Sequence, residues 1–158
     1  MSQPVNFGKL SQHESAEKSP GFLLWSVSTL WRRKIEEVLK PLGLTHPQFV
    51  ILATTGWLTR TGQSVTQTEV GRYAALDPNT TSQILRSLEA KGWIQRTHRC
   101  DERSKSPCLT EIGTTLLNKA LPAVEQADAH FFAPLQNSQD GMLSNLKLLA
   151  HLNTGEKT

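Results

Sequence analysis

The feature that most constrains this chain is a well-delimited helix that runs directly into a basic segment, within residues 76–113. Asp77 can accept hydrogen bonds from the free amides at a helix start, and Pro78 has the backbone angle favoured in the first turn. Gly92 can adopt the left-handed conformation that ends a helix. The sequence therefore predicts a helix between Asp77 and Gly92.

The periodicity of this helix gives it two different faces. A buried stripe is expected at Thr81, Ile84, Leu85 and Leu88. The outward face of its N-terminal half holds Asn79, Thr80, Ser82, Gln83 and Arg86. These outward side chains can donate and accept hydrogen bonds with base edges and phosphates, so the face favours contact with DNA. A solvated polar face with no partner is the competing explanation.

Two shorter signals upstream predict two more helices. Thr45 and Gln48 form a capping box that begins a helix running toward Arg60, and Thr66 with Glu69 repeats the device. The inward residues of the second helix are expected to be Val70, Tyr73, Ala74 and Leu76. One or two residues would join it to the helix after Asp77, and two helices joined so tightly suggest a helix-turn-helix.

After Gly92 the spacing of the apolar residues changes from the helical period to the two-residue period of β-strands. "WIQRT" and "SPCLT" predict two short strands around "HRCDERSK", a hairpin of the kind called a wing. The basic residues expected on its loop are Arg96, Arg99, Arg103 and Lys105. Guanidinium groups carried there can enter a minor groove while the preceding helix lies in the major groove. Pro107 lacks an amide hydrogen, so its strand is expected to pair poorly there or to expose that edge, and the wing to be short or unusually bent.

Long helices are expected on both sides of this unit. Apolar residues recur at steps of three and four from Leu24 to Leu42, and Thr110 begins another long helix expected to bend or break at Pro122. A final helix is expected to carry Leu143, Leu146, Leu149, Ala150 and Leu152. The predicted fold is thus mainly α-helical with one small β-hairpin. Residues 1–19 are polar and weakly patterned, and are expected to form a mobile arm, with residues 154–158 as a tail.

Composition excludes several classes of protein. The 158 residues fit a single domain, with 37% hydrophobic and 20% charged residues and a net charge of +3. The two cysteines, Cys100 and Cys108, match neither a disulfide framework nor a zinc site. Without a signal peptide or a membrane-spanning run, we expect a soluble, cytoplasmic protein. No nucleophile with its base and no phosphate-binding loop is evident, so we expect neither an enzyme nor a cofactor.

Three segments together resemble the multiple antibiotic resistance regulator (MarR) family of bacterial transcription factors. They are "LGLTHPQFVIL", "TQTEVGRYAALDPNTTSQILRSLEAKGWIQR" and "DERSKSPCLTEIG", and the resemblance covers about residues 20–153. It implies a winged helix-turn-helix lobe over residues 45–110, flanked by dimerisation helices over residues 20–44 and 111–153. It also implies that Asp101 and Arg103 form the acid–base pair that orders the wing.

The resemblance further implies a homodimer that binds double-stranded DNA, most simply as a repressor of a pseudo-palindromic operator. The DNA-binding residues would be Asn79, Thr80, Ser82, Gln83, Arg86, Arg99, Arg103 and Lys105. Glu102 stands where many relatives have a second basic residue, which disfavours insertion of the wing tip and makes Arg99 a substitute. Relatives bind phenolic compounds between the dimer helices and the DNA lobe. A pocket for a small aromatic ligand is therefore expected near Trp31, His46 and Trp57, with packing as the competing role for each.

Other chemistries remain as alternatives. The same fold can serve as a protein-interaction module that does not bind DNA. The five histidines are scattered without a metal-binding spacing, so a metal site is not expected. Oxidation of Cys100, between Arg99 and the other basic residues of the wing, would offer a redox switch. An inert exposed thiol is the simpler alternative.

Overall fold

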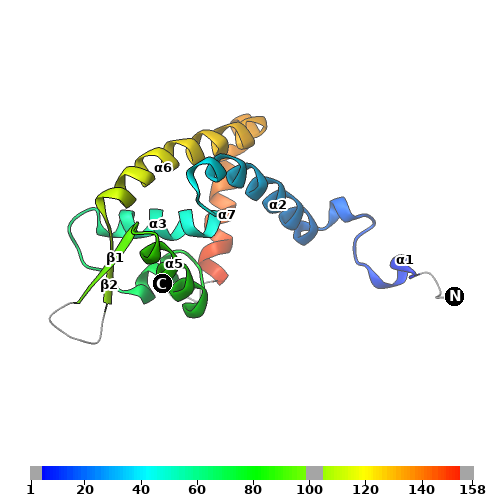
Figure 1. The fold of residues 1–158 in the computed structure, drawn as a ribbon. Helices are drawn as coiled ribbons and strands as arrows, with labels where there is room; N and C mark the ends of the chain where they lie inside the picture. The colour runs from blue at the N-terminus through cyan, green and yellow to red at the C-terminus, as the bar shows by residue number, and fades with distance from the viewer. Residues whose placement is uncertain (1–4, 99–104, 154–158) are drawn as a thin grey trace.

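A computed structural model describes residues 5–98 and 105–153. The elements follow the chain in the order α1 (Phe7–Leu10), η1 (Ala16–Lys18), α2 (Pro20–Leu39), η2 (Lys40–Leu42), α3 (His46–Thr59), α4 (Gln67–Tyr73), α5 (Pro78–Ala90), β1 (Ile94–His98), β2 (Lys105–Leu109), α6 (Glu111–Phe132), η3 (Ala133–Ser138) and α7 (Gln139–Asn153). The expected fold class is confirmed: helices dominate, and a single hairpin interrupts them (Figure 1). Across the described ranges, no helix is both long and apolar enough to span a membrane.

The helix starts form as the sequence predicts. Thr45 and Thr66 each accept a hydrogen bond from the amide three residues on, and the side-chain oxygens of Gln48 and Glu69 each accept one from the cap amide. Both capping boxes are therefore complete. At the helix ends, Gly43, Gly62 and Gly92 all have positive φ, which glycine tolerates without steric cost.

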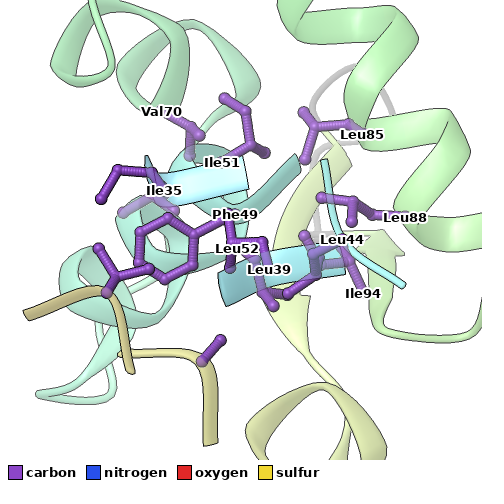
Figure 2. Close-up of a cluster of buried hydrophobic side chains, with 13 residues drawn as sticks. Ile35, Leu39, Leu44, Phe49, Ile51, Leu52, Val70, Leu85, Leu88 and Ile94 are labelled. Atoms are coloured by element: carbon purple, nitrogen blue, oxygen red, sulfur yellow. The ribbon is translucent and has the colours of Figure 1, made fainter. Parts of the chain in front are cut away.

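The core lies where α2, α3, α5 and the wing meet (Figure 2). Its fully buried members include Ile35, Leu39, Ile51, Leu52, Leu85 and Leu88. Ile94 at the start of β1 joins the same cluster, so the first strand of the wing is anchored in the core. The long α6 runs alongside α2, and Ala120 and Val124 add the α6 side of the cluster.

The turn of the helix-turn-helix is longer than the sequence suggested. Helix α4 ends at Tyr73 and α5 begins at Pro78, so four residues join them instead of one or two. Ala75 has a φ of 53°, a left-handed conformation uncommon for a residue with a Cβ atom. The expected inward position of Tyr73 is also wrong, since its side chain is 60% exposed.

The wing is a two-stranded antiparallel hairpin. Its register pairs Ile94 with Leu109 and His98 with Lys105, one residue away from the predicted strand limits. Pro107 is buried and stands opposite Arg96 within a continuous register, so the strand does not lose its pairing there. The sheet has only two strands among the described residues, which leaves the exposed-edge alternative open. Residues 99–104, which include Arg99, Asp101 and Arg103, lie outside the described residues.

Helix α6 is continuous through Pro122, so the expected interruption does not occur. Figure 1 shows α6 as a gently curved helix that arches over the rest of the chain. It ends at Phe132, and the kinked segment η3, with Gln136 at a φ of 46°, leads into α7. Within this chain α7 makes its main contacts with η3.

Candidate nucleic-acid interface

The polar face of α5 forms as predicted. Asn79, Gln83 and Arg86 are exposed, and Thr80 and Ser82 are half-buried. On the opposite face Thr81, Leu85 and Leu88 are buried, and Ile84 packs against the core from a half-buried position. The five predicted polar residues thus lie together on the N-terminal half of α5, and α5 as a whole lies next to the wing strands (Figure 1).

The start of α5 is fixed by Asp77. One carboxylate oxygen accepts hydrogen bonds from the amides of Asn79 and Thr80, at 3.0 and 2.9 Å. The other accepts one from the Thr80 hydroxyl at 2.6 Å. These bonds, that of the Thr80 side chain above all, lower the pKa of Asp77 below its ordinary value. The Thr80 side chain is thereby held against the cap, because its hydroxyl donates to the Asp77 carboxylate.

A second contact orders the next turn. Arg86 donates from Nη2 to the Ser82 hydroxyl at 3.1 Å, one helical turn earlier. The guanidinium is therefore directed toward the N-terminal half of α5 while it stays exposed. A guanidinium retains four further N–H donors after one such bond, enough for bidentate contact with an acceptor pair.

Gly71 of α4 packs directly against the Thr81 side chain of α5. A Cβ atom on Gly71 would lie 2.6 Å from Oγ1 of Thr81, so only glycine permits this spacing. The Thr81 hydroxyl in turn donates to the Asp77 carbonyl at 2.9 Å. The sequence analysis missed Gly71, although a glycine inside a short predicted helix is a signal of close packing.

The wing is attached to α5 and α6 at its base. A Cβ atom on Gly113 would lie 1.9 Å from the Trp93 carbonyl oxygen, so α6 starts directly against the chain that leads into β1. The Thr110 hydroxyl donates to the Gly92 carbonyl at 2.7 Å, and the Thr110 amide donates to the Trp93 carbonyl at 3.2 Å. The hairpin base is therefore held by both helices that flank it.

Arg96 lies in β1, and its assignment to the wing loop is wrong. Its guanidinium forms an ion pair with Glu89 of α5, with Nη2 2.7 Å from the carboxylate, and its side chain is only 10% exposed. The arginine therefore connects the wing to the recognition helix. Lys105 opens β2.

A polar network that was not predicted from the sequence joins α5 to the α2–α3 junction. Gln48 donates from its amide nitrogen to the Ser87 hydroxyl at 2.9 Å, while its oxygen completes the cap of α3. Lys91 donates to the Gly43 carbonyl at 3.1 Å and lies 4.4 Å from the centre of the Trp93 ring. The C-terminal end of α5 is therefore bonded to the α2–α3 junction.

The three residues of the predicted ligand pocket do not come together. Trp31 and His46 are in contact, ring edge to face, with centroids 5.0 Å apart. Trp57 is on the same helix as His46 but roughly 16 Å further along its axis. Its ring is 52% exposed and stacked under Arg60 at 3.7 Å, so the expected core position is wrong. Trp57 instead lines a separate cavity of about 460 Å³ between α3 and α6, which Tyr73 and Leu121 also border.

Trp31 and His46 join three helices. The indole nitrogen of Trp31 on α2 donates to Asp128 on α6 at 2.6 Å. His46 at the start of α3 is buried, and burial, aided by the charge of Arg32, lowers its pKa below 6.5. Glu36 and Asp128 oppose that shift. Trp31 and His46 are therefore packed side chains at the junction of α2, α3 and α6.

The described residues offer little other chemistry. Among them, no group of three or more histidine, cysteine or acidic side chains is placed to hold a metal ion. Cys108 is a free, half-buried thiol, and Cys100 lies outside the described part of the chain.

Comparison with known proteins agrees with this architecture. Residues 42–104 match the model of the MarR family. The HTH-type transcriptional regulator YdcH of Bacillus subtilis is 35% identical over 142 residues, which cover 89% of this chain and 97% of YdcH. The HTH-type transcriptional repressor Rv2887 of Mycobacterium tuberculosis is 32% identical over 78% of this chain and 88% of its own length.

Solved structures of Rv2887 have the same fold. Its complex with p-aminosalicylic acid superposes with a TM-score of 0.64 at 32% identity, covering 82% of this chain and 98% of the other. Its complex with DNA gives a TM-score of 0.61 at 29% identity, covering 85% and 98%. The family consists of transcriptional regulators and not of enzymes. The capped polar helix, the hairpin beside it and these similarities together show that the chain belongs to the MarR family of DNA-binding, winged helix-turn-helix transcriptional regulators.

Proposed function

We propose that this protein is a homodimeric repressor that binds a pseudo-palindromic operator and is released from it by a small aromatic ligand. The observation that carries the proposal is the polar face of α5, fixed at its start by Asp77 and placed beside the wing. Asn79, Gln83 and Arg86 would contact base edges, and Thr80 and Ser82 would contact phosphates or position their neighbours. Arg99, Arg103 and Lys105 would supply wing contacts, with Asp101 ordering Arg103.

The dimer is supported by two apolar surfaces that this chain leaves uncovered. The N-terminal half of α2 exposes Phe22, Leu23, Leu24, Trp25, Val27 and Leu30. Helix α7 exposes Leu143, Leu146, Leu148, Leu149 and Leu152. Contiguous apolar surface of this kind marks an interaction site, and a second copy of the chain would cover both surfaces symmetrically. A two-fold dimer requires a DNA site with matching two-fold symmetry.

Release by a ligand is supported by the cavity beside Trp57. The cavity opens between α3 and α6. In the proposed dimer, α3 is part of the DNA-binding lobe and α6 is one of the dimerisation helices. An aromatic ring lying against Trp57, with an acidic group at Arg60, would alter the spacing of these two helices. The relative Rv2887 binds p-aminosalicylic acid, which is a compound of this type. Only a dimer with the correct spacing of its lobes can occupy both half-sites, so such a shift would weaken DNA binding.

The test is fluorescence anisotropy with labelled duplexes from upstream of the protein's own gene and a scrambled control, over a series of salt concentrations. We expect two protomers per duplex, preference for the upstream fragment and a steep loss of affinity with salt. Such a regulator would act in the cytoplasm, on chromosomal DNA. Absence of binding to either duplex at low salt would instead favour a protein-interaction module.

A further inference from the structure

Gln48, at the start of α3, makes a contact that its role as a helix cap does not require. The capping box needs only a side-chain oxygen here, which accepts a hydrogen bond from the Thr45 amide at 3.1 Å. The amide nitrogen of Gln48 makes a second bond, because it donates to the Ser87 hydroxyl of α5 at 2.9 Å. This bond is partly buried and joins residues 39 positions apart in the chain. One side chain thus both begins α3 and connects it to the recognition helix.

The neighbours of the Gln48 amide determine its orientation. Its oxygen faces two donors, the Thr45 amide and the Lys91 ammonium, the second at 3.4 Å. Rotating the amide by half a turn would place its nitrogen, itself a donor, against both of them. One orientation therefore satisfies all the partners, and in that orientation the nitrogen points to Ser87.

Lys91, which follows the last residue of α5, reinforces the same connection. Its ammonium donates to the Gly43 carbonyl at 3.1 Å as well as to the Gln48 oxygen. Gly43 lies between η2, which continues from the end of α2, and the start of α3. The C-terminal part of α5 is therefore bonded through Ser87 and Lys91 to the chain that leads from α2 into α3.

These bonds add direction to the contact between α5 and the core. Leu85 and Leu88 bury the inner face of α5 in the apolar cluster (Figure 2). The free energy of such contact depends on the apolar area that is buried and has little directional preference. Hydrogen bonds are favourable only within a narrow range of distances and angles. The bonds of Gln48 and Lys91 therefore limit rotation and sliding of α5 against the α2–α3 junction.

We propose that Gln48 is a positioning residue for operator recognition, which acts through Ser87 and Lys91 to set the orientation of α5 relative to the dimerisation helix α2. The inference rests on the proposed function, because this orientation matters where two lobes of a dimer bind one duplex. After one lobe has bound, the other binds its half-site intramolecularly, with an effective concentration that depends on geometry. A less defined orientation of α5 lowers that concentration and leaves the contacts of a single lobe with its own half-site unchanged.

Four variants separate the hydrogen bonds from other effects. Gln48→Met keeps the length of this half-buried side chain and removes its hydrogen bonds, and Ser87→Ala removes one of them. Gln48→Glu keeps an oxygen for Thr45 and Lys91, and the Ser87 hydroxyl can turn to donate to the carboxylate. Gln126→Ala, at an exposed glutamine of α6, is the matched control. Lys91 is left unchanged, because the charge of an exposed cation contributes to DNA affinity by itself.

The first measurement is anisotropy at one salt concentration, with the upstream duplex and with the same duplex after one half-site is scrambled. Gln48→Met is expected to lower affinity for the intact site roughly tenfold and for the scrambled one by less than about twofold. Ser87→Ala should act in the same direction, and Gln48→Glu and Gln126→Ala should stay near wild type. A ratio of the two affinities unchanged in both Gln48→Met and Ser87→Ala overturns the proposal. Equal losses on the two duplexes overturn it as well, since they would indicate direct DNA contact or a damaged lobe.

The second measurement needs no DNA. In a chain with Cys100→Ser and Cys108→Ser, Arg33→Cys on α2 and Ala90→Cys on α5 give two exposed sites for spin labels. An excess of unlabelled protein leaves one labelled protomer per dimer, so double electron–electron resonance records the distance between α2 and α5 of one chain. Gln48→Met is expected to broaden or shift the distance distribution, and Gln48→Glu to keep that of the wild type. Identical distributions in the wild type and Gln48→Met overturn the proposal.

The two proposals fail separately in this design. Absence of DNA binding, with a distance distribution altered by Gln48→Met, rejects the repressor and leaves Gln48 as the residue that positions α5. Preference for the intact operator, with both the distribution and the affinity ratio unchanged by Gln48→Met, rejects the role of Gln48 and leaves the repressor.

Discussion

Arg96 of the wing and Glu89 of the recognition helix form an ion pair in which Nε and Nη2 both lie within 2.9 Å of one carboxylate oxygen. Arg96 is nearly buried and Glu89 is 41% exposed, so the pair is partly shielded from solvent. It fixes the hairpin relative to the helix expected to lie in the major groove. The guanidinium thereby connects β1 to α5 at a fixed point.

Loss of either partner is expected to have the same effect. Arg96→Ala and Glu89→Gln should each lower the free energy of unfolding by about 0.5–1 kcal/mol, the upper range for partly exposed pairs. Both should also weaken operator binding, because the wing is then free to change its angle. Urea unfolding and anisotropy measure the two effects.

Glu37→Gln is the matched control, since it breaks the Lys34–Glu37 pair, whose side chains are both 61% exposed. We expect little change from it. Tighter DNA binding by Glu89→Gln would contradict the structural role, because it would show that the released Arg96 contacts phosphate directly.

Arg86→Ala tests the base-contacting role of α5. Its side chain is exposed and directed along the helix by Ser82, so its loss should remove a contact with one base pair. Specific binding is expected to weaken by about 1–3 kcal/mol, and binding to random duplex much less. Lys119→Ala, an exposed cation on α6, is the control for charge alone. Equal losses on specific and random duplexes would assign Arg86 to the phosphate backbone.

The cap of α5 should give stability a defined dependence on pH. The folded pKa of Asp77 is lowered, so its contribution is fully present above the unfolded value of 3.8 and is lost as the pH falls through the lower folded value. Asp77→Ala should lose this contribution at neutral pH. Asp77→Asn retains a good capping side chain and should lose only the pH dependence. Thermal unfolding between about pH 5 and pH 2.5 measures this difference, and parallel profiles for wild type and Asp77→Asn would contradict the cap as its source.

His46 should make the stability of the folded protein depend on pH just below neutrality. Burial lowers its pKa, so the folded protein disfavours the protonated ring. Stability is therefore complete above the unfolded value of 6.5 and declines as the pH falls below it. His46→Gln should flatten the decline in urea unfolding between about pH 7.5 and pH 5. His130→Gln, on α6, is the control, and an equal decline in wild type and His46→Gln would reject the assignment.

The sequence predicted the parts of this fold that depend on local chemistry. Caps at Thr45, Thr66 and Asp77 need only a side chain and the backbone that follows it, so their patterns were sufficient. The longer turn at Ala75 was not predictable in this way, since alanine has no preference for a positive φ. The exposure of Tyr73 follows from that turn.

Contacts between distant elements were the least predictable. The ion pair of Arg96 depends on how the wing lies against α5, and nothing local to "WIQRT" indicates Glu89 as its partner. Packing was the expected alternative role for Trp57 because of its place late in the helix, but the residue borders the cavity between α3 and α6 and is half-exposed.

Helix α7 provides the test of the dimer. Its leucines are exposed in the single chain, and its main contacts there are with η3, so removing it should leave the core around Ile35 and Leu52 intact. Deletion from Ser144 onward should therefore lower the helical signal only by the residues removed and preserve thermal cooperativity, while sedimentation velocity shows a shift toward monomer. Leu146→Lys with Leu149→Lys should act in the same direction without shortening the chain, because a lysine is costly to bury in an apolar interface. Lys147→Ala, between them on the same helix, should leave the dimer in place. A dimer unchanged by both the deletion and the double substitution would exclude α7 from the interface, and the exposed face of α2 would then have to supply it alone.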